Sequence, residues 1–145
     1  MINKDFKEFI ALLNSHQVKY LVIGGYAIAF HGHPRYTKDL DVWVLIDSKN
    51  AYGITGALKD FGFASLGITE QDFLSPHTIV QLGQPPNRID ILTSASGIHF
   101  EDCYPNKQEV VIDGVPISFI DLENLKKNKR ATGRLQDLAD VERLQ

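Results

Sequence analysis

Residues 20–46 read YLVIGGYAIAFHGHPRYTKDLDVWVLI, and this stretch decides the fold. A short run rich in β-forming residues, Tyr20–Ile23, stops at two glycines, and a helix-compatible segment, Tyr26–Phe30, follows them. After an irregular segment, residues 39–46 form a second run of mostly apolar, β-forming residues. The pattern therefore predicts a strand, a tight turn, a helix and a second strand.

Aspartates interrupt the second apolar run at alternate positions. Because successive side chains of a strand point to opposite faces, Asp39, Asp41 and Trp43 are predicted to share one face. A third aspartate, Asp90, lies in RIDIL on another predicted strand. Like charges held close together repel and are costly to desolvate unless cations neutralise them. Carboxylates at this density suit Mg²⁺, which prefers oxygen ligands and leaves other positions to water and phosphate.

Each of these motifs also has a simpler explanation when it is taken alone. Alternating aspartates are common on the solvent face of an edge strand, and two glycines can form an ordinary tight turn. Gly24 and Gly25 would also suit a phosphate, because a glycine turn allows close backbone approach and offers free N–H groups. The order of the two motifs along the chain favours a phosphate and metal site over the simpler explanations.

Periodicity and turn residues predict the other elements. They are an opening helix through Phe6–Leu13 capped by Asn3 or Asp5, a helix over 48–60 with a Ser48 cap, strands over 78–82 and 88–93, two strands within 109–120 around an Asp113-Gly114 hairpin turn, and helices over 121–130 and 135–144 separated by Gly133. On the strand over 88–93, Arg88 and Asp90 share one face. We therefore predict an α+β fold: a mixed twisted sheet with helices mainly on one face and two C-terminal helices.

Length and composition limit the possible functions. The 145 residues are predicted to form a single domain, 1–145. The net charge of -3 lacks the basic excess of a protein that wraps DNA. One cysteine, Cys103, supports neither an internal disulfide nor a cysteine zinc site. No apolar run is long enough to be a signal peptide core or a membrane span, so we expect a cytoplasmic protein.

Three stretches, VIGGYAIAFHG, RYTKDLDVWV and NRIDILTS, occur in an order that resembles the DNA polymerase β-like nucleotidyltransferase superfamily. The tail LENLKKNKRATGRLQDLADVERL is similar to that of its small bacterial members, the abortive-infection (AbiEii-type) toxin nucleotidyltransferases. The resemblance extends from about Tyr20 to the end of the chain. It implies a nucleotidyltransferase fold.

The resemblance also implies roles for individual residues. Gly24 and Gly25 match the turn that holds the nucleoside triphosphate, although the serine found there in many members is absent. Asp39 and Asp41 match the paired metal ligands. Asp90 matches the third carboxylate, which assists the metals and can accept the proton of the attacking hydroxyl.

Weaker matches flank these motifs. Arg35 and Thr37 match the polar lead-in to the aspartate strand, where the arginine either contacts the triphosphate or forms a surface ion pair. Lys129 matches a lysine that recurs before the final helix, and Asp137 an aspartate of that helix. Five basic residues within 126–134, Arg134 among them, form either a solvated helical face or an attractor for triphosphate or RNA.

The implied reaction is transfer of a nucleoside monophosphate from a nucleoside triphosphate to an acceptor hydroxyl, with pyrophosphate leaving and two Mg²⁺ ions as cofactors. The acceptor is a small molecule, an RNA or a protein. A homodimer or an antitoxin-like partner chain would complete so short a protein. The rival interpretation is a module of the same fold that binds nucleotide or a partner without transferring anything. The His31-x-His33 pair predicts a loop near the nucleotide or plain surface histidines rather than zinc.

Overall fold

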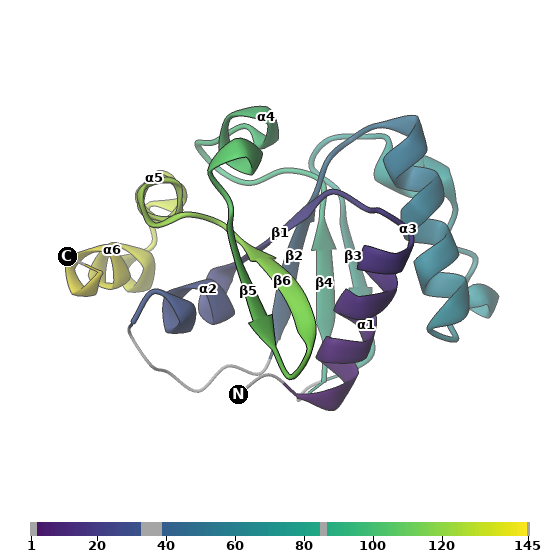
Figure 1. Ribbon diagram of the computed structural model, residues 1–145. Helices are drawn as coiled ribbons and strands as arrows, with labels where there is room; N and C mark the ends of the chain where they lie inside the picture. The colour runs from purple at the N-terminus through teal and green to yellow at the C-terminus, as the bar shows by residue number, and fades with distance from the viewer. Residues whose placement is uncertain (1–2, 33–38, 85–86, 145) are drawn as a thin grey trace.

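A computed structural model describes residues 3–32, 39–84 and 87–144. Within these residues, six strands form one mixed sheet in the order β3-β4-β2-β1-β6-β5 (Figure 1). The strands are β1 (Tyr20–Ile23), β2 (Leu40–Val44), β3 (Ile79–Leu82), β4 (Ile89–Leu92), β5 (Gln108–Ile112) and β6 (Val115–Phe119). The predicted α+β fold with a mixed sheet is confirmed.

Helices flank the sheet. They are α1 (Lys4–Ser15), α2 (Gly24–Phe30), α3 (Ser48–Asp60), α4 (Phe100–Cys103), α5 (Leu122–Thr132) and α6 (Leu135–Arg143), with short 3-10 turns at 64–66, 70–73 and 104–106. In Figure 1, α1 and α3 lie side by side at one flank, while α2, α5 and α6 gather at the other. The expectation that helices lie mainly on one face is therefore wrong.

Strand alternation explains why the two faces differ. The Tyr20 hydroxyl donates to Asn14 Oδ1 of α1 at 3.0 Å, so Tyr20 and its i+2 neighbour Val22 face α1. In the antiparallel pairing of β1 with β2, Val22 lies opposite Val42, and Ile23 lies opposite Asp41. The face toward α1 is accordingly an apolar core, and Asp41 belongs to the second face of the sheet.

Caps and turns mostly follow the predicted chemistry. Asn3 caps α1, since its Oδ1 accepts from the Phe6 N–H at 2.9 Å. Asp113 and Gly114 both have positive φ, 51° and 82°, which the predicted hairpin turn requires. The predicted Ser48 cap is wrong, because Asp47 accepts from the Asn50 N–H at 3.2 Å, and Ser48 is the first helical residue.

The part of the chain that the structure describes includes no helix long and apolar enough to cross a lipid bilayer. The Cys103 thiol is buried in the core, and Cys103 is the last residue of α4, a short helix that periodicity did not reveal. Burial, followed by the charges of Asp121 and Asp102, raises the pKa of this thiol to about 11. Cys103 is therefore a protonated packing residue at neutral pH.

Candidate active site

The pairing of β2 with β4 brings two of the predicted metal ligands side by side. The strands are parallel, and Asp41 lies opposite Asp90 in the register. Adjacent strands are about 4.8 Å apart, so the two carboxylates leave the second face of the sheet as neighbours. Asp39 lies one residue before β2, because the strand begins at Leu40 rather than at Asp39 as predicted. We call Asp39, Asp41 and Asp90 the carboxylate cluster.

The backbone of Gly24 lies against the Asp41 carboxylate. Its φ is +71°, in the left-handed region that favours glycine, and a Cβ added there would overlap the Asp41 carboxylate. The helix α2 begins at Gly24, two residues earlier than predicted. Gly24 lines the cavity beside the carboxylates, whereas Gly25 is not among the lining residues. The first glycine of the pair is thus required by the aspartate itself.

Arg88 is the functional candidate that sequence reasoning missed. Its Nη2 lies 2.9 Å from Asp39 Oδ2 and donates to Asp90 Oδ2 at 3.2 Å, and its Nε lies 3.0 Å from Asp90 Oδ1. One guanidinium therefore contacts two members of the carboxylate cluster. The alternation that puts Arg88 and Asp90 on one face was a usable signal for this contact.

The electrostatic cost of the carboxylate cluster falls on Asp41. Burial first, and then the negative charges of Asp90 and Asp39, raise the pKa of its carboxyl to about 7. The positive charges of Lys129 and Arg88 act in the opposite direction without cancelling the shift. At neutral pH, a nearby cation would therefore stabilise the ionised form of Asp41.

The donor chemistry of the carboxylate cluster fits Mg²⁺. Asp39 Oδ1 and Asp90 Oδ1 are buried and accept no hydrogen bond from a described residue, since the Arg88 Nε contact to Asp90 is an ion pair without hydrogen-bond geometry. Hard carboxylate oxygens without hydrogen bonds are the ligands that this ion prefers. As they stand, however, no three acidic, histidine or cysteine side chains of the described residues are gathered tightly enough to hold a metal.

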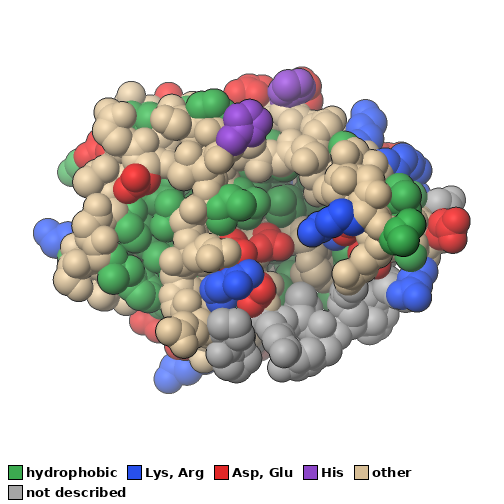
Figure 2. Space-filling view, turned by 180° about the vertical axis from the view of Figure 1, so that it is seen from behind, with side chains coloured by type: hydrophobic (Ala, Val, Ile, Leu, Met, Phe, Trp, Pro, Cys, Tyr) green, Lys and Arg blue, Asp and Glu red, His purple; other side chains and the backbone are tan. Residues whose placement is uncertain are grey.

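A cavity of about 920 Å³ opens beside the carboxylate cluster. Gly24 and Asp41 line one part of it, and Lys129 and Arg134 line another. The rest of the lining includes apolar side chains from the sheet, the loop after β4 and the start of α4, namely Trp43, Ile79, Leu92, Ile98 and Phe100. Figure 2 shows acidic side chains at the floor of this hollow, with basic side chains near them and hydrophobic surface beside them.

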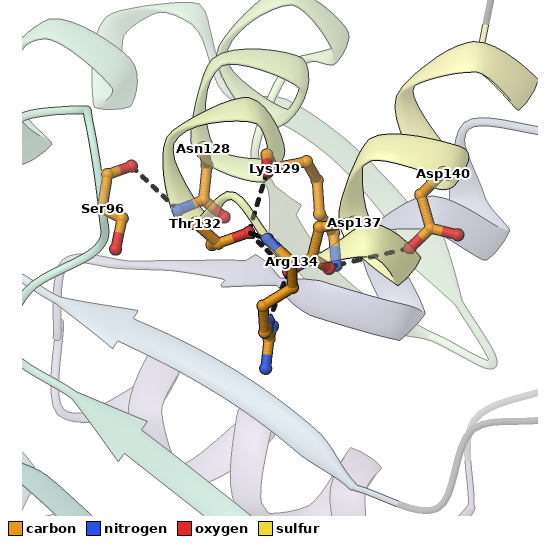
Figure 3. A network of polar contacts seen from close by, with 7 residues as sticks. All are labelled: Ser96, Asn128, Lys129, Thr132, Arg134, Asp137 and Asp140. Carbon is orange, nitrogen blue, oxygen red and sulfur yellow. Dashed lines mark hydrogen bonds and ion pairs between the residues drawn. The ribbon is translucent and has the colours of Figure 1, made fainter.

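Behind the cavity, Lys129 of α5 is held by two buried aspartates of α6 (Figure 3). Its Nζ donates to Asp137 Oδ1 at 2.8 Å and lies 3.7 Å from Asp140 Oδ2. Both aspartates are 2% exposed or less. We call Lys129, Asp137 and Asp140 the lysine cluster. It fixes the ammonium group at the wall of the cavity.

Asp137 also accepts hydrogen bonds from two other side chains. The Thr132 hydroxyl and Arg134 Nε each donate to Asp137 Oδ2 at 2.6 Å. Burial raises the pKa of Asp137, but the hydrogen bonds from Lys129, Thr132 and Arg134 outweigh it and lower the pKa to about 2. Arg134 itself remains 72% exposed at the cavity, so Asp137 orients an arginine that a ligand could reach.

The other predicted residues are placed as follows. Arg35 and Thr37, together with His33, lie outside the described residues. His31 lies with Nε2 2.7 Å from the Ile120 carbonyl oxygen, a structural contact. Trp43 is buried, packs edge-on against Phe100 and also borders the cavity.

The basic segment 126–134 is not the uniformly solvated face that was one of its two interpretations. Lys126 and Lys129 are both buried. Asn128, also buried, donates to the Ser96 carbonyl oxygen at 3.0 Å and so ties α5 to the loop that follows β4 (Figure 3). The inner side of α5 is therefore part of the cavity wall.

Comparisons with known proteins support the fold. No protein-family model and no curated protein matches the chain. Among solved structures, it is similar to a provisionally assigned nucleotidyltransferase from Thermotoga maritima, with a TM-score of 0.64 and 16% identity over 99% of this chain and 94% of that one. An antigenic nucleotidyltransferase-like protein from Paracoccidioides brasiliensis matches with a TM-score of 0.56 and 15% identity, covering 99% of this chain and 77% of the other. The chain has the nucleotidyltransferase fold.

Proposed function

We propose that this protein is a Mg²⁺-dependent nucleotidyltransferase of the cytoplasm. The observation that carries the proposal is the register of β2 with β4, which sets Asp41 beside Asp90 at a cavity whose wall includes Lys129. The carboxylate cluster reaches this cavity through Asp41, and Lys129 and Arg134 also line it, an arrangement that suits a triphosphate bound through metal ions. The fold that the chain shares with its structural neighbours agrees with this chemistry.

In this proposal, Asp39, Asp41 and Asp90 hold the metal. Their oxygens fit the ion, and two of them have no hydrogen bond from the described residues. When bound, Mg²⁺ would neutralise phosphate charge and stabilise the oxygens of the attacking and leaving groups. The lack of a side chain at Gly24 allows the backbone to lie close to the Asp41 carboxylate. Gly25, Arg35 and Thr37 keep the nucleotide-binding roles that the sequence resemblance implies.

The remaining groups bind and orient the substrate. Lys129 and Arg134, both oriented by Asp137, would contact the triphosphate. The acceptor oxygen forms a bond to the α-phosphorus while the bond to the leaving pyrophosphate breaks, and Asp90 takes the proton of the acceptor hydroxyl. Positioning and charge neutralisation supply the rate enhancement. The acceptor is a small molecule, an RNA end or a protein hydroxyl.

We also propose that the protein belongs to the toxin-like group of nucleotidyltransferases. The C-terminal pattern that resembles abortive-infection toxins includes Lys129 and Asp137, and these two residues are in contact at 2.8 Å. A second copy of the chain or an antitoxin-like partner would contribute the surface that recognises the acceptor.

The experiment measures transfer of label from α-³²P-labelled nucleoside triphosphates in Mg²⁺, with small hydroxyl compounds, total RNA and proteins as acceptors. We expect Asp39→Asn and Asp41→Asn each to lower transfer at least about a hundredfold, the scale of losing one electrostatic catalytic contact. Asp113→Asn, at an exposed hairpin turn, is the matched control and should transfer normally. Transfer that is indifferent to both active-site substitutions would refute the assigned roles.

A non-catalytic binding module is the second candidate. The observation that favours it is that the carboxylate cluster is not gathered into a metal site as it stands. Nucleotide binding measured by calorimetry, with no pyrophosphate released for any acceptor tested, would select this candidate over the enzyme.

A further inference from the structure

The guanidinium of Arg88 lies where a cation would be expected. Its Nη2 is 2.9 Å from Asp39 Oδ2 and 3.2 Å from Asp90 Oδ2, and its Nε is 3.0 Å from Asp90 Oδ1. Asp39 and Asp90 are two of the three proposed metal ligands. A guanidinium and a divalent cation repel one another, and both would bind the carboxylates of Asp39 and Asp90, with Asp90 Oδ1 in common, so the two cations compete for this place.

The backbone fixes the position from which Arg88 reaches these carboxylates. The Leu40 N–H donates to the Arg88 carbonyl oxygen at 3.1 Å, which places Arg88 next to the start of β2. Asp90 follows two residues later in β4, and therefore projects from the same face of the sheet. The Arg88 side chain is 30% exposed, so it can turn toward solvent while its backbone stays in place.

Charge balance explains why this contact forms and why it is incomplete. The formal charges of three carboxylates and one guanidinium sum to minus two, which is the charge that one divalent cation would neutralise. The lysine cluster does not supply the deficit, because Lys129 is already paired with Asp137 and Asp140. Asp39 Oδ1 and Asp90 Oδ1 accept no hydrogen bond from a described residue even with Arg88 in contact.

We infer that Arg88 is a resident counterion of the carboxylate cluster. It neutralises Asp39 and Asp90 while no metal is bound, and it must leave them when a divalent cation binds. The inference rests on the proposed function, since it takes Asp39 and Asp90 as metal ligands. It also accounts for the absence of a gathered metal site among the described residues. The cost of displacing the guanidinium lowers the metal affinity of the nucleotide-free protein.

The test measures Mn²⁺ affinity of the nucleotide-free protein by calorimetry and by electron paramagnetic resonance. We expect Arg88→Gln to bind Mn²⁺ about tenfold more tightly than the unaltered protein, as for a lost competition of roughly 1.4 kcal/mol. Arg88→Lys keeps the charge but not the fork that contacts both carboxylates, so its affinity should lie between the two. Lys7→Gln removes the same charge from an exposed ion pair with Asp113 and is the control, with affinity near that of the unaltered protein.

The outcomes separate this inference from the proposed function. If Asp39→Asn weakens Mn²⁺ binding but Arg88→Gln binds no more tightly than the unaltered protein, the counterion role is overturned and the metal site stands. If neither Asp39→Asn nor Asp90→Asn alters Mn²⁺ binding, whether Arg88 is present or replaced by Gln, both the counterion role and the proposed metal site are overturned. Should Arg88→Gln fail to fold by circular dichroism, nitrogen-15 NMR of the unaltered protein decides. The Arg88 Nε–H signal should shift as Mg²⁺ is added, and an unchanged signal overturns the inference.

Discussion

The carboxylate cluster and the lysine cluster both place charge beside the same cavity, but they satisfy it differently. In the lysine cluster, Asp137 accepts hydrogen bonds from Lys129, Thr132 and Arg134, and its pKa is lowered to about 2. In the carboxylate cluster, the pKa of Asp41 is raised to about 7 and two buried oxygens have no hydrogen bond from the described residues. The contrast separates a cluster whose buried carboxylate is satisfied by neighbouring donors from one in which two buried carboxylate oxygens lack hydrogen bonds from the described residues.

The largest effect is expected where the complete cluster is broken. Asp137→Ala leaves Lys129 buried with only the more distant Asp140, so we expect the free energy of unfolding to fall by about 3 to 5 kcal/mol. Urea denaturation followed by circular dichroism measures it. Glu142→Ala removes an exposed carboxylate from the same helix and should change stability by less than about 0.5 kcal/mol. Equal effects of the two substitutions would contradict the structural role of the lysine cluster.

A smaller loss of stability is expected when a side chain is added at Gly24, next to the carboxylate cluster. Gly24→Ala combines left-handed backbone strain with overlap of the Asp41 carboxylate, and should cost about 2 to 4 kcal/mol of unfolding free energy. Gly67→Ala is a matched control, because its φ of +73° is nearly that of Gly24 and nothing lies within 4 Å of the added Cβ. Most of the excess over this control should disappear when Gly24→Ala is measured in the Asp41→Ala background, because only the Asp41 Cβ, at 3.3 Å, would still lie close. If the excess persists, Asp41 is not what excludes the side chain.

The smallest effect concerns pH, measured by thermal unfolding in a chelating buffer. Because the folded pKa of Asp41 lies near 7, above its ordinary 3.8, the native state keeps a proton that the unfolded state has released. Stability should therefore fall as the pH rises from about 4 to 7. Asp41→Asn should remove this decline and raise the midpoint at pH 7 by about 3 °C or more, as for a gain near 1 kcal/mol.

Asp137 gives the opposite sign in a lower window. Its folded pKa of about 2 lies below the ordinary 3.8, so its contribution is present above about pH 4 and is lost as the pH falls toward 2. The Asp41→Asn variant should still lose stability as the pH falls from about 4 toward 2. A variant whose profile is flat in both windows would show that the two clusters are not independent.

Much of the fold was predictable because it depends on local chemistry. Apolar spacing predicted α1, the β-forming runs predicted the strands, and the Asp113-Gly114 hairpin has the positive φ angles that its sequence requires. The four-residue α4 was missed because one turn of helix is too short to show a period. Ser48 was mistaken for a cap because Asp47, one residue earlier, has the same capping chemistry.

The site was only partly predictable, because its contacts join distant parts of the chain. The sequence placed Asp39 and Asp41 on one strand, but only the register of β2 with β4 brings Asp90 beside Asp41. The pairing of Lys129 with Asp137 spans the break at Gly133, so no helical spacing predicts it. Which side chain would neutralise Asp39 and Asp90 depended on strand pairing as well as on alternation.

The same register has a consequence for how the chain avoids misfolding. Ile89 and Ile91 are buried on the face opposite to Asp90. If β4 slipped by one residue against β2, the isoleucines would move to the open face and Asp90 would enter the apolar core. A buried, unpaired carboxylate there would cost far more than the slipped pairing gains. Asp90, the aspartate proposed for chemistry, thus also disfavours the wrong register of β4 against β2 while the sheet assembles.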